Sequence, residues 1–299
     1  MLSRLADRLY GNAYILLSFT ALFWAGNFVL GRGVHEHVPP LALAWTRWTF
    51  AALIIFPFAL SHMRRDWPVI RRNLPILVFF GTVGVGAFNT LSYTGLNYTT
   101  ALNALVLQSS GPILIVLASV LIFRDRITYR QMLGICLSLT GVLLMVARGD
   151  LSVLAELELN RGDLMLVLAL ALWGLYTSFL RKRPNIHWLS FIGTTFAIGS
   201  LANLPFFLFE HLFVRQLHFD AETAAAIAYV SIFPSILAYI CFNRGVELIG
   251  STRAGVCLHL VPPFGAVLAI TLLGEELRLY HVAGIALILA GVSLTARQP

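Results

Sequence analysis

Long uncharged apolar runs follow one another along almost the whole sequence, and only short polar or charged segments separate them. The hydrocarbon core of a bilayer is about 30 Å thick, so roughly 20 apolar residues make one helical span. Because backbone N–H and C=O groups in lipid must be paired within their own segment, we expect each run to be a helix. Ten spans are predicted, at residues 13–31, 41–61, 73–123 (two spans joined by a polar turn at 97–100), 131–147, 164–180, 188–209, 223–243, 254–274 and 282–296.

The composition agrees with a membrane protein. Of the 299 residues 58% are apolar and only 12% are charged, too few to cover the surface of a soluble domain. The net charge of +7 comes from short basic clusters between the apolar runs, an arrangement that does not indicate a nucleic-acid partner. The three cysteines lie inside apolar runs without the spacing of a metal or redox pair. We therefore expect no metal and no cofactor.

Arginine and lysine are distributed unequally between alternate connecting segments. With the N-terminus inside the cell, the cytoplasmic segments hold fifteen of these residues and the opposite segments five. The positive-inside rule then predicts a multi-pass protein of the cell (inner) membrane with both termini in the cytoplasm. The first apolar run is too long for a signal-peptide core, so we expect it to remain as the first span.

The sequence resembles itself after a shift of about 150 residues. Pro112 then falls on Pro262, and Trp24 meets Trp173 after a slightly smaller shift. Each half carries five spans, and an odd number forces the second copy to enter the membrane upside down. We predict an all-α integral membrane protein of ten transmembrane helices, arranged as two inverted five-helix repeats around a central cavity. The predicted units are a first repeat at 1–148, a periplasmic linker at 149–161 and a second repeat at 162–299.

Several motifs resemble those of one transporter superfamily. They are the segment Leu22-Phe23-Trp24-Ala25-Gly26-Asn27-Phe28, the turn from Thr99 to Ala104, Pro112, and Leu273-Gly274-Glu275 with Gly284 and Gly291. The chain resembles the drug/metabolite transporter superfamily, with two EamA-type domains over nearly its whole length; the first repeat departs from the pattern at Arg124-Asp125. It is most similar to YddG-type exporters of aromatic and other apolar amino acids. The resemblance implies ten helices around a central cavity and export of amino acids or metabolites.

Prolines interrupt two of the predicted helices near their middle. Proline lacks a backbone N–H, so Pro112 frees the carbonyl of Gln108 and Pro262 that of Leu258. A free carbonyl at membrane depth is tolerated where it faces protein or a water-filled cavity, so we expect these helices to line a pathway; a plain packing kink is the alternative. Matching interruptions at 84–86 and 234–235 favour the cavity.

Polar side chains at membrane depth are costly and tend to face the interior. The candidates for a substrate site are Asn27, Asn89, Gln108, Ser109, Ser110, Tyr239, Asn243 and His259. Gln108, Ser109 and Ser110, beside the Pro112 break, either bind a substrate's carboxylate and ammonium groups or form hydrogen bonds with neighbouring helices. His259 either binds substrate or takes up a proton, or it is a neutral histidine that packs in the interior.

One charged residue, Arg47, lies well inside a predicted span. It either attracts a substrate carboxylate or extends to the membrane interface. Aromatic residues in or near the regions expected to face the cavity suit flat or apolar solutes; these are Trp24, Tyr93, Trp173 and Tyr176. An aromatic belt at the interface is the competing interpretation, and repeat symmetry favours the pathway for the two tryptophans. Glycines at seven-residue spacing, Gly134 with Gly141 and Gly284 with Gly291, predict close helix packing.

These features together favour an exporter of amino acids or similar metabolites that works by alternating access in the lipid bilayer. No Asp or Glu lies inside a predicted span, although proton-coupled transporters usually place a carboxylate there. We therefore expect transport driven by the solute's own gradient, or weakly coupled through His259. The alternatives are a transporter of nucleotide-sugars or cationic drugs. An intramembrane enzyme lacks support because no cluster of catalytic residues is present.

Overall fold

The computed structural model describes residues 10–34, 38–99, 104, 107–156, 158–273 and 278–296, and these residues form helices and connecting segments without a β-strand. The first half contains α2 (Ala13–Val34), α3 (Pro40–Arg72), α4 (Leu74–Phe79), η1 (Phe80–Ala87), α5 (Phe88–Leu96), α7 (Gly111–Phe123), α8 (Tyr129–Val146) and η2 (Leu151–Glu156). The second half contains α9 (Arg161–Phe179), η3 (Leu180–Lys182), α10 (Trp188–Phe213), α11 (Ala221–Ser231), η4 (Ile232–Leu237), α12 (Ala238–Ile249), α13 (Ser251–Cys257), η5 (Leu258–Leu260), α14 (Val261–Leu273) and α15 (Leu279–Ala296). Arg4, Arg8 and Arg297, three of the basic residues counted in the cytoplasmic segments, lie outside the described residues, as do the motif residues Thr100, Gly274 and Glu275.

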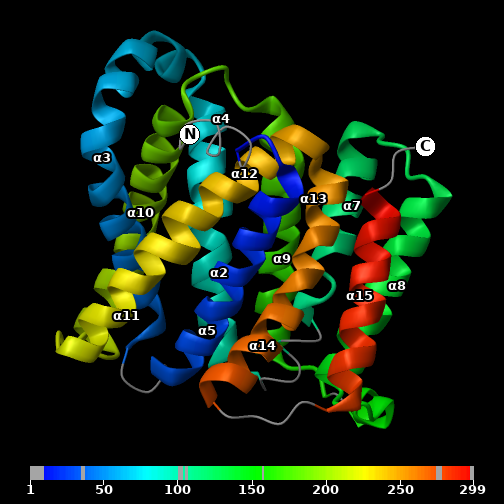
Figure 1. Cartoon of the computed structure of the whole chain (residues 1–299). Coiled ribbons are helices and arrows are strands. Elements are labelled where there is room, and N and C mark those ends of the chain that lie inside the picture. The colour runs from blue at the N-terminus through cyan, green and yellow to red at the C-terminus, as the bar shows by residue number, and fades with distance from the viewer. Residues whose placement is uncertain are drawn as a thin grey trace.

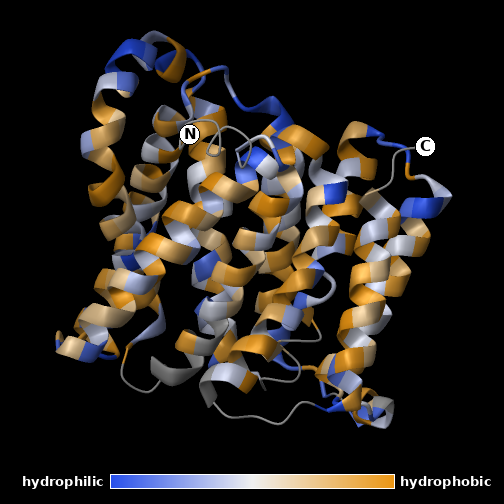
Figure 2. Cartoon of the chain, viewed as in Figure 1, coloured by the Kyte–Doolittle hydropathy of each residue, from blue (hydrophilic) through white to orange (hydrophobic). Residues whose placement is uncertain are grey.

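Seven helices in the described part are long and apolar enough to cross a membrane, counting consecutive segments such as α4, η1 and α5 as one. Two shorter apolar helices accompany them, at Ala13–Asn27 and Gly111–Phe123. Figure 2 shows hydrophobic residues mainly along the middle of the helices and hydrophilic ones gathered toward both ends of the bundle. The predicted class, an all-helical protein with several apolar spans, is confirmed.

The helix interruptions take two forms. The segments η1 and η4 are π-helical turns, at the places where Gly84–Gly86 and Pro234–Ser235 predict a break. Near the other two prolines the regular α-helix is interrupted, as predicted, by a turn before Pro112 and by the 3-10 turn η5 before Pro262. Pro112 lies in the first turn of α7, a position that tolerates proline, and Pro262 lies in the first turn of α14, directly after η5. The regular helical hydrogen bonding is therefore disturbed just before each of these prolines.

Several pairs of neighbouring helices pack along each other (Figure 1). At one edge of the bundle α8 lies along α15, and at the other edge α3 lies along α10. Between them α2 packs against α12, and α5 packs against α9. The Tyr14 hydroxyl donates to the Ala296 carbonyl over 3.3 Å, so the start of α2 and the end of α15 lie at the same end of the bundle.

Glycines bring α8 and α15 into backbone contact. A Cβ added at Gly134 would lie 2.6 Å from the Gly291 carbonyl oxygen, and one at Gly141 would lie 2.7 Å from that of Gly284. The order of these contacts makes the two helices antiparallel. The predicted role of all four glycines, close helix packing, is confirmed.

We expect Gly141→Ala to destabilise the protein by about 1–3 kcal/mol, because the new methyl group forces apart two helices that touch through their backbones. The measurement is the thermal unfolding midpoint of the purified protein in detergent. Gly265→Ala in α14 is the matched control, since its Cβ would meet nothing within 4 Å and alanine favours a helix. Equal midpoints for the two variants would contradict the expectation.

Candidate functional site

The Arg47 side chain turns into the protein interior, so the alternative in which it extends to the membrane interface is wrong. It is 2% exposed, and its guanidinium lies among side chains of α2, α5 and η4. Nη1 donates to the Asn89 Oδ1 over 3.1 Å, to the Tyr93 hydroxyl over 2.8 Å and to the Asn27 Oδ1 over 3.5 Å. Three residues predicted from sequence thus converge on a fourth. We call this group, with Pro234 and Ser235, the Arg47 site.

The π-helical turn η4 supplies the remaining acceptors of the Arg47 site. Because Pro234 has no N–H, the Val230 carbonyl four residues earlier lacks its helical donor, and the Ser235 hydroxyl donates to it over 2.6 Å. The Ser235 oxygen in turn accepts from Arg47 Nε over 2.5 Å. The Pro234 carbonyl accepts from Arg47 Nη2 and from the Trp24 indole N–H, each over 3.0 Å.

All these acceptors are neutral. Within the described residues no carboxylate forms an ion pair with Arg47, and Nη2 has a single acceptor for its two N–H groups. A buried charge without a counter-ion costs several kcal/mol. Binding an anion would offset the free-energy cost of this buried positive charge, so the Arg47 site is suited to an anionic ligand. Asn27 and Tyr93 are only half-buried, so the site has a partly open edge.

Next to the Arg47 site, aromatic rings from both halves fill the centre of the bundle. Trp24 meets Trp173 edge-on with ring centroids 5.2 Å apart, and Trp173 stacks on Tyr176 at 5.0 Å. Trp173 and Tyr176 are buried, and Tyr239 is 2% exposed, so the interfacial-belt interpretation is wrong for the two tryptophans. The Tyr239 hydroxyl donates to the Gly84 carbonyl of η1 over 2.7 Å. We call this group, with Phe242 and Phe80, the aromatic core.

Asn243 lies on the side of the aromatic core that faces away from the Arg47 site. Its Oδ1 accepts a hydrogen bond from the Tyr176 hydroxyl over 2.9 Å. Its amide nitrogen is buried without a partner among the described residues. A small pocket bordered by Asn243 and Glu247 has room for about one water molecule there. Asn243 is thus separated from the Arg47 site by the aromatic rings.

The breaks in the two proline-containing helices touch each other. His259 in η5 is buried; its Nε2 lies 3.1 Å from the Ser109 carbonyl oxygen and its Nδ1 lies 2.6 Å from the Ser138 hydroxyl. A carbonyl can only accept, so Nε2 carries a proton. Both ring nitrogens are therefore used in contacts between helices, which favours the packed interpretation of this histidine. Gln108 and Ser110 are half-buried beside the break.

The helices extend beyond the predicted spans, and buried carboxylates lie in their end turns. Glu210, in the last turn of α10, is 5% exposed and accepts from the Ala42 N–H of α3 over 2.7 Å. Asp163, in the first turn of α9, accepts from the Asn160 N–H over 2.8 Å. The expectation that no acidic residue lies inside a span needs this correction. Both carboxylates pair with N–H groups at helix starts, a structural role.

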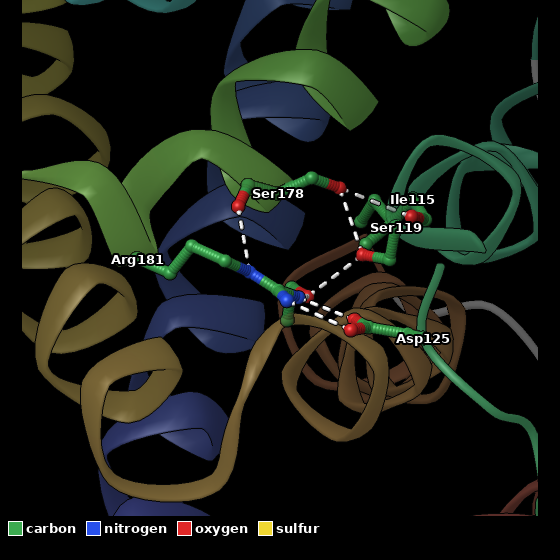
Figure 3. Close-up of polar contacts among 6 residues, drawn as sticks. Ile115, Ser119, Asp125, Ser178 and Arg181 are labelled. Carbon is green, nitrogen blue, oxygen red and sulfur yellow. Dashed lines mark hydrogen bonds and ion pairs between the residues drawn. The ribbon is translucent and has the colours of Figure 1, made fainter. Parts of the chain in front are cut away.

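Three serines and an ion pair join the ends of α7, of α9 with η3, and of α13. Figure 3 shows Ser119, Ser178, Asp125 and Arg181 of this group. The Ser119 hydroxyl lies 2.9 Å from each of the Ser178 and Ser251 hydroxyls. Arg181 forms a two-pronged ion pair with Asp125 and donates to the Ser178 carbonyl over 3.2 Å. We call these five residues the serine–ion-pair cluster.

The ion pair of this cluster persists over the physiological pH range. The hydrogen bonds from Arg181 lower the pKa of Asp125 below its ordinary value, which is about 3.9. A carboxylate with a lowered pKa contributes stability at higher pH and loses it as the pH falls through that lowered value. The pair is therefore intact above about pH 4. Since both side chains are about a third exposed, its contribution to stability is small.

The aromatic core connects the Arg47 site with the serine–ion-pair cluster. Ring contacts run from Tyr176 through Phe80 and Phe79 to Phe179 and Phe123, and the Arg181 guanidinium lies 4.3 Å from the Phe123 ring centroid. A continuous chain of packed aromatic rings thus lies between the two sites at this end of the bundle.

Comparison with known proteins identifies the family. The model of the EamA-like transporter family matches the sequence twice, over residues 11–147 and 160–297. The chain belongs to the EamA-like transporter family. It is therefore a multi-pass membrane transporter, as the composition and the resemblance predict.

Curated relatives align with this EamA-like transporter over nearly their whole length. "Uncharacterized transporter YyaM" of Bacillus subtilis is 27% identical over 286 residues, which are 95% of this chain and 93% of the relative. The "Probable amino-acid metabolite efflux pump" of Salmonella typhimurium is 28% identical over 294 residues, 93% of this chain and 92% of the relative. A solved crystal structure shares the fold, with a TM-score of 0.75, 18% identity and coverage of 95% and 96% of the two chains.

Sequence reasoning missed two parts of the site in this EamA-like transporter. The first is the pair of acceptors in η4, Pro234 and Ser235, which the sequence identifies as a helix interruption but not as partners of Arg47. The missing N–H of a proline was the available signal. The second is the serine–ion-pair cluster, whose serines come from three distant segments without a shared pattern.

Proposed function

We propose that this EamA-like transporter exports small organic solutes that carry a carboxylate, by alternating access between two inverted five-helix repeats. Aromatic and other apolar amino acids and their metabolites are the leading class, as in the YddG-type exporters that the sequence resembles. The observation that carries the proposal is the Arg47 site, a buried guanidinium with neutral acceptors only, beside an aromatic wall.

The packing of the two halves supports an inverted repeat. α2 packs antiparallel to α12, since Leu17 lies at Gly245 and Trp24 at Pro234. The corresponding pair α5 and α9 is also antiparallel, with Gly95 at Gly162 and Phe88 at Trp173. A two-fold relation that exchanges the halves accounts for both pairs, and it brings residue pairs such as Trp24 and Trp173 together at the centre.

The two ends of the bundle differ in how tightly they are closed, and this difference supports alternating access. The aromatic core and the serine–ion-pair cluster close the end of the bundle where α2 starts and α15 ends. The half-buried Asn27 and Tyr93 lie on the other side of the aromatic core. With both termini in the cytoplasm, as the basic residues predict, the closed end is cytoplasmic. The transporter then loads substrate only after this end opens.

Transport by the purified protein in liposomes tests the proposal. We expect liposomes that contain the protein to take up labelled L-phenylalanine or its N-acetyl derivative at least 10-fold faster than protein-free liposomes. The reason is that the Arg47 site provides a pathway for the carboxylate that lipid does not. Unlabelled substrate inside should accelerate the uptake by exchange. Fluxes equal to those of protein-free liposomes for both compounds would reject the proposal.

A further inference from the structure

We propose that the Arg47 site selects carboxylates without a free ammonium group, so that the transported species carries one net negative charge. N-acylated amino acids and oxo acids are solutes of this class. The inference rests on the proposed function and narrows its substrates.

The first argument is the charge of the site. Arg47 brings one positive charge into the centre of the bundle, and its partners among the described residues are an amide oxygen from each of Asn27 and Asn89, two hydroxyls and a carbonyl. A monoanion neutralises this charge on binding. A zwitterion brings a positive group as well, so the occupied site keeps a net charge in a medium of low dielectric constant.

The second argument is the lack of a receiver for an ammonium group. The Asn89 Oδ1 and the Tyr93 hydroxyl already accept from the guanidinium. The Pro234 carbonyl accepts from Arg47 and Trp24, and the Asn27 Oδ1 accepts from Arg47 and the Tyr93 hydroxyl. The Trp24 ring, which a cation could approach, packs against Trp173 and Phe242. Within the described residues no carboxylate lies in the Arg47 site to pair with an ammonium. One N–H of the Arg47 Nη2, in contrast, has no acceptor among the described residues and can donate to a carboxylate.

A net charge of minus one also supplies a driving force. In alternating access the site charge stays in place while the solute crosses, so the charge moved is that of the solute. A membrane potential that is negative inside then drives an anion outward, by about 50-fold in concentration for each 100 mV. Export would need neither a proton nor a carboxylate relay, and the carboxylates of Glu210 and Asp163 are engaged at helix ends.

The experiment compares three solutes with one side chain on proteoliposomes fixed to a solid-supported membrane. At about pH 6, N-acetyl-L-phenylalanine is an anion, L-phenylalanine a zwitterion and L-phenylalaninamide a cation. For the N-acetyl compound we expect a transient current whose sign corresponds to the movement of negative charge with the solute. Its half-saturating concentration should be at least 10-fold below that of phenylalanine. 3-Phenylpropionate, which lacks the amino group, should compete with the N-acetyl compound. Arg65→Gln, on the exposed part of α3, should keep the current.

Two results separate this inference from the function on which it rests. If labelled phenylalanine is transported as well as the N-acetyl compound, or if the N-acetyl compound crosses without moving charge, the inference is overturned and the transporter proposal stands. If protein-containing liposomes transport none of the three solutes, the proposed function fails as well.

Discussion

Replacing Arg47 by glutamine is expected to reduce transport of a carboxylate solute about 100-fold. The guanidinium is the one charge of the Arg47 site, and charge-assisted hydrogen bonds to a carboxylate are worth about 1.5–3 kcal/mol each. A 100-fold loss corresponds to about 2.8 kcal/mol, so one or two such bonds account for it. The measurement is initial uptake of the labelled solute into proteoliposomes at several substrate concentrations.

Arg47→Lys is expected to recover only part of the loss. Lysine keeps the charge but not the planar fork, which here donates from three nitrogens to Ser235, Asn89 and Pro234. The ammonium is a compact point charge and cannot bridge these acceptors while also binding a carboxylate. We expect transport between that of the wild type and that of the glutamine variant.

The control is Arg65→Gln, the same change on the same helix. The Arg65 side chain is 72% exposed and its ion pair with Asp66 is 3.9 Å long, so its loss should leave transport within about two-fold because exposed pairs contribute little. Thermal midpoints of both variants in detergent separate a lost site from a lost fold. Wild-type transport by a folded Arg47→Gln protein would exclude Arg47 as the carboxylate-binding group.

Much of the fold could be predicted because lipid restricts a chain to few solutions. Backbone pairing makes apolar runs helical, and the internal shift of about 150 residues indicates which segments correspond. The shift also relates Ser109 to His259 and Gly84 to Pro234. In the structure Ser109 contacts His259 directly, and the carbonyls of Gly84 and Pro234 both accept from side chains of the opposite half.

The local geometry at the interruptions could not be predicted from residue types. A proline removes the same hydrogen bond whether it kinks a helix, starts a new one or lies in a π-helical turn. Neighbouring helices decide among these outcomes, and they gave a restart at Pro112 and a π-turn at Pro234. The π-helical turn at Pro234 in turn decided which groups bind Arg47. One of them is a backbone carbonyl, which every residue type carries and which the sequence therefore does not identify.

The serines of the serine–ion-pair cluster illustrate a second limit. Serine inside a transmembrane helix commonly bonds its own backbone, so Ser119, Ser178 and Ser251 each resemble many other serines. Their meeting depends on how α7, α9 and α13 converge at one end of the bundle. Asp125, where the first repeat departs from the superfamily pattern, was the visible signal, and its ion pair with Arg181 lies beside the three hydroxyls.

A disulfide across this cluster is expected to stop transport. In a protein whose Cys136, Cys241 and Cys257 are replaced by alanine, Ser119→Cys together with Ser251→Cys puts two sulfurs in place of hydroxyl oxygens 2.9 Å apart. Since a disulfide needs about 2.05 Å between sulfurs and no large backbone shift, oxidation should link α7 to α13. We expect transport to fall at least 10-fold after oxidation and to return on reduction with dithiothreitol.

The expectation follows from the path that a solute must take. A chain of packed aromatic rings lies between the Arg47 site and the cluster, so we expect a solute to pass along this path only if the helix ends separate and the rings move apart. α7 belongs to the first half and α13 to the second, and their separation is the motion that the disulfide prevents. The ion pair alone is a weaker restraint because it is partly exposed, whereas a covalent link cannot open during the cycle.

Each single cysteine variant, treated with the same oxidant, controls for damage by the substitution or by oxidation. Both should transport at the rate of the cysteine-free protein, since Ser119 and Ser251 are buried and cysteine is a small buried residue that packs in their place. The extent of cross-linking is read from the mass of the fragment pair after proteolysis. If a fully cross-linked protein still transports, this end of the bundle does not open, and substrate must reach the Arg47 site by a route between other helices.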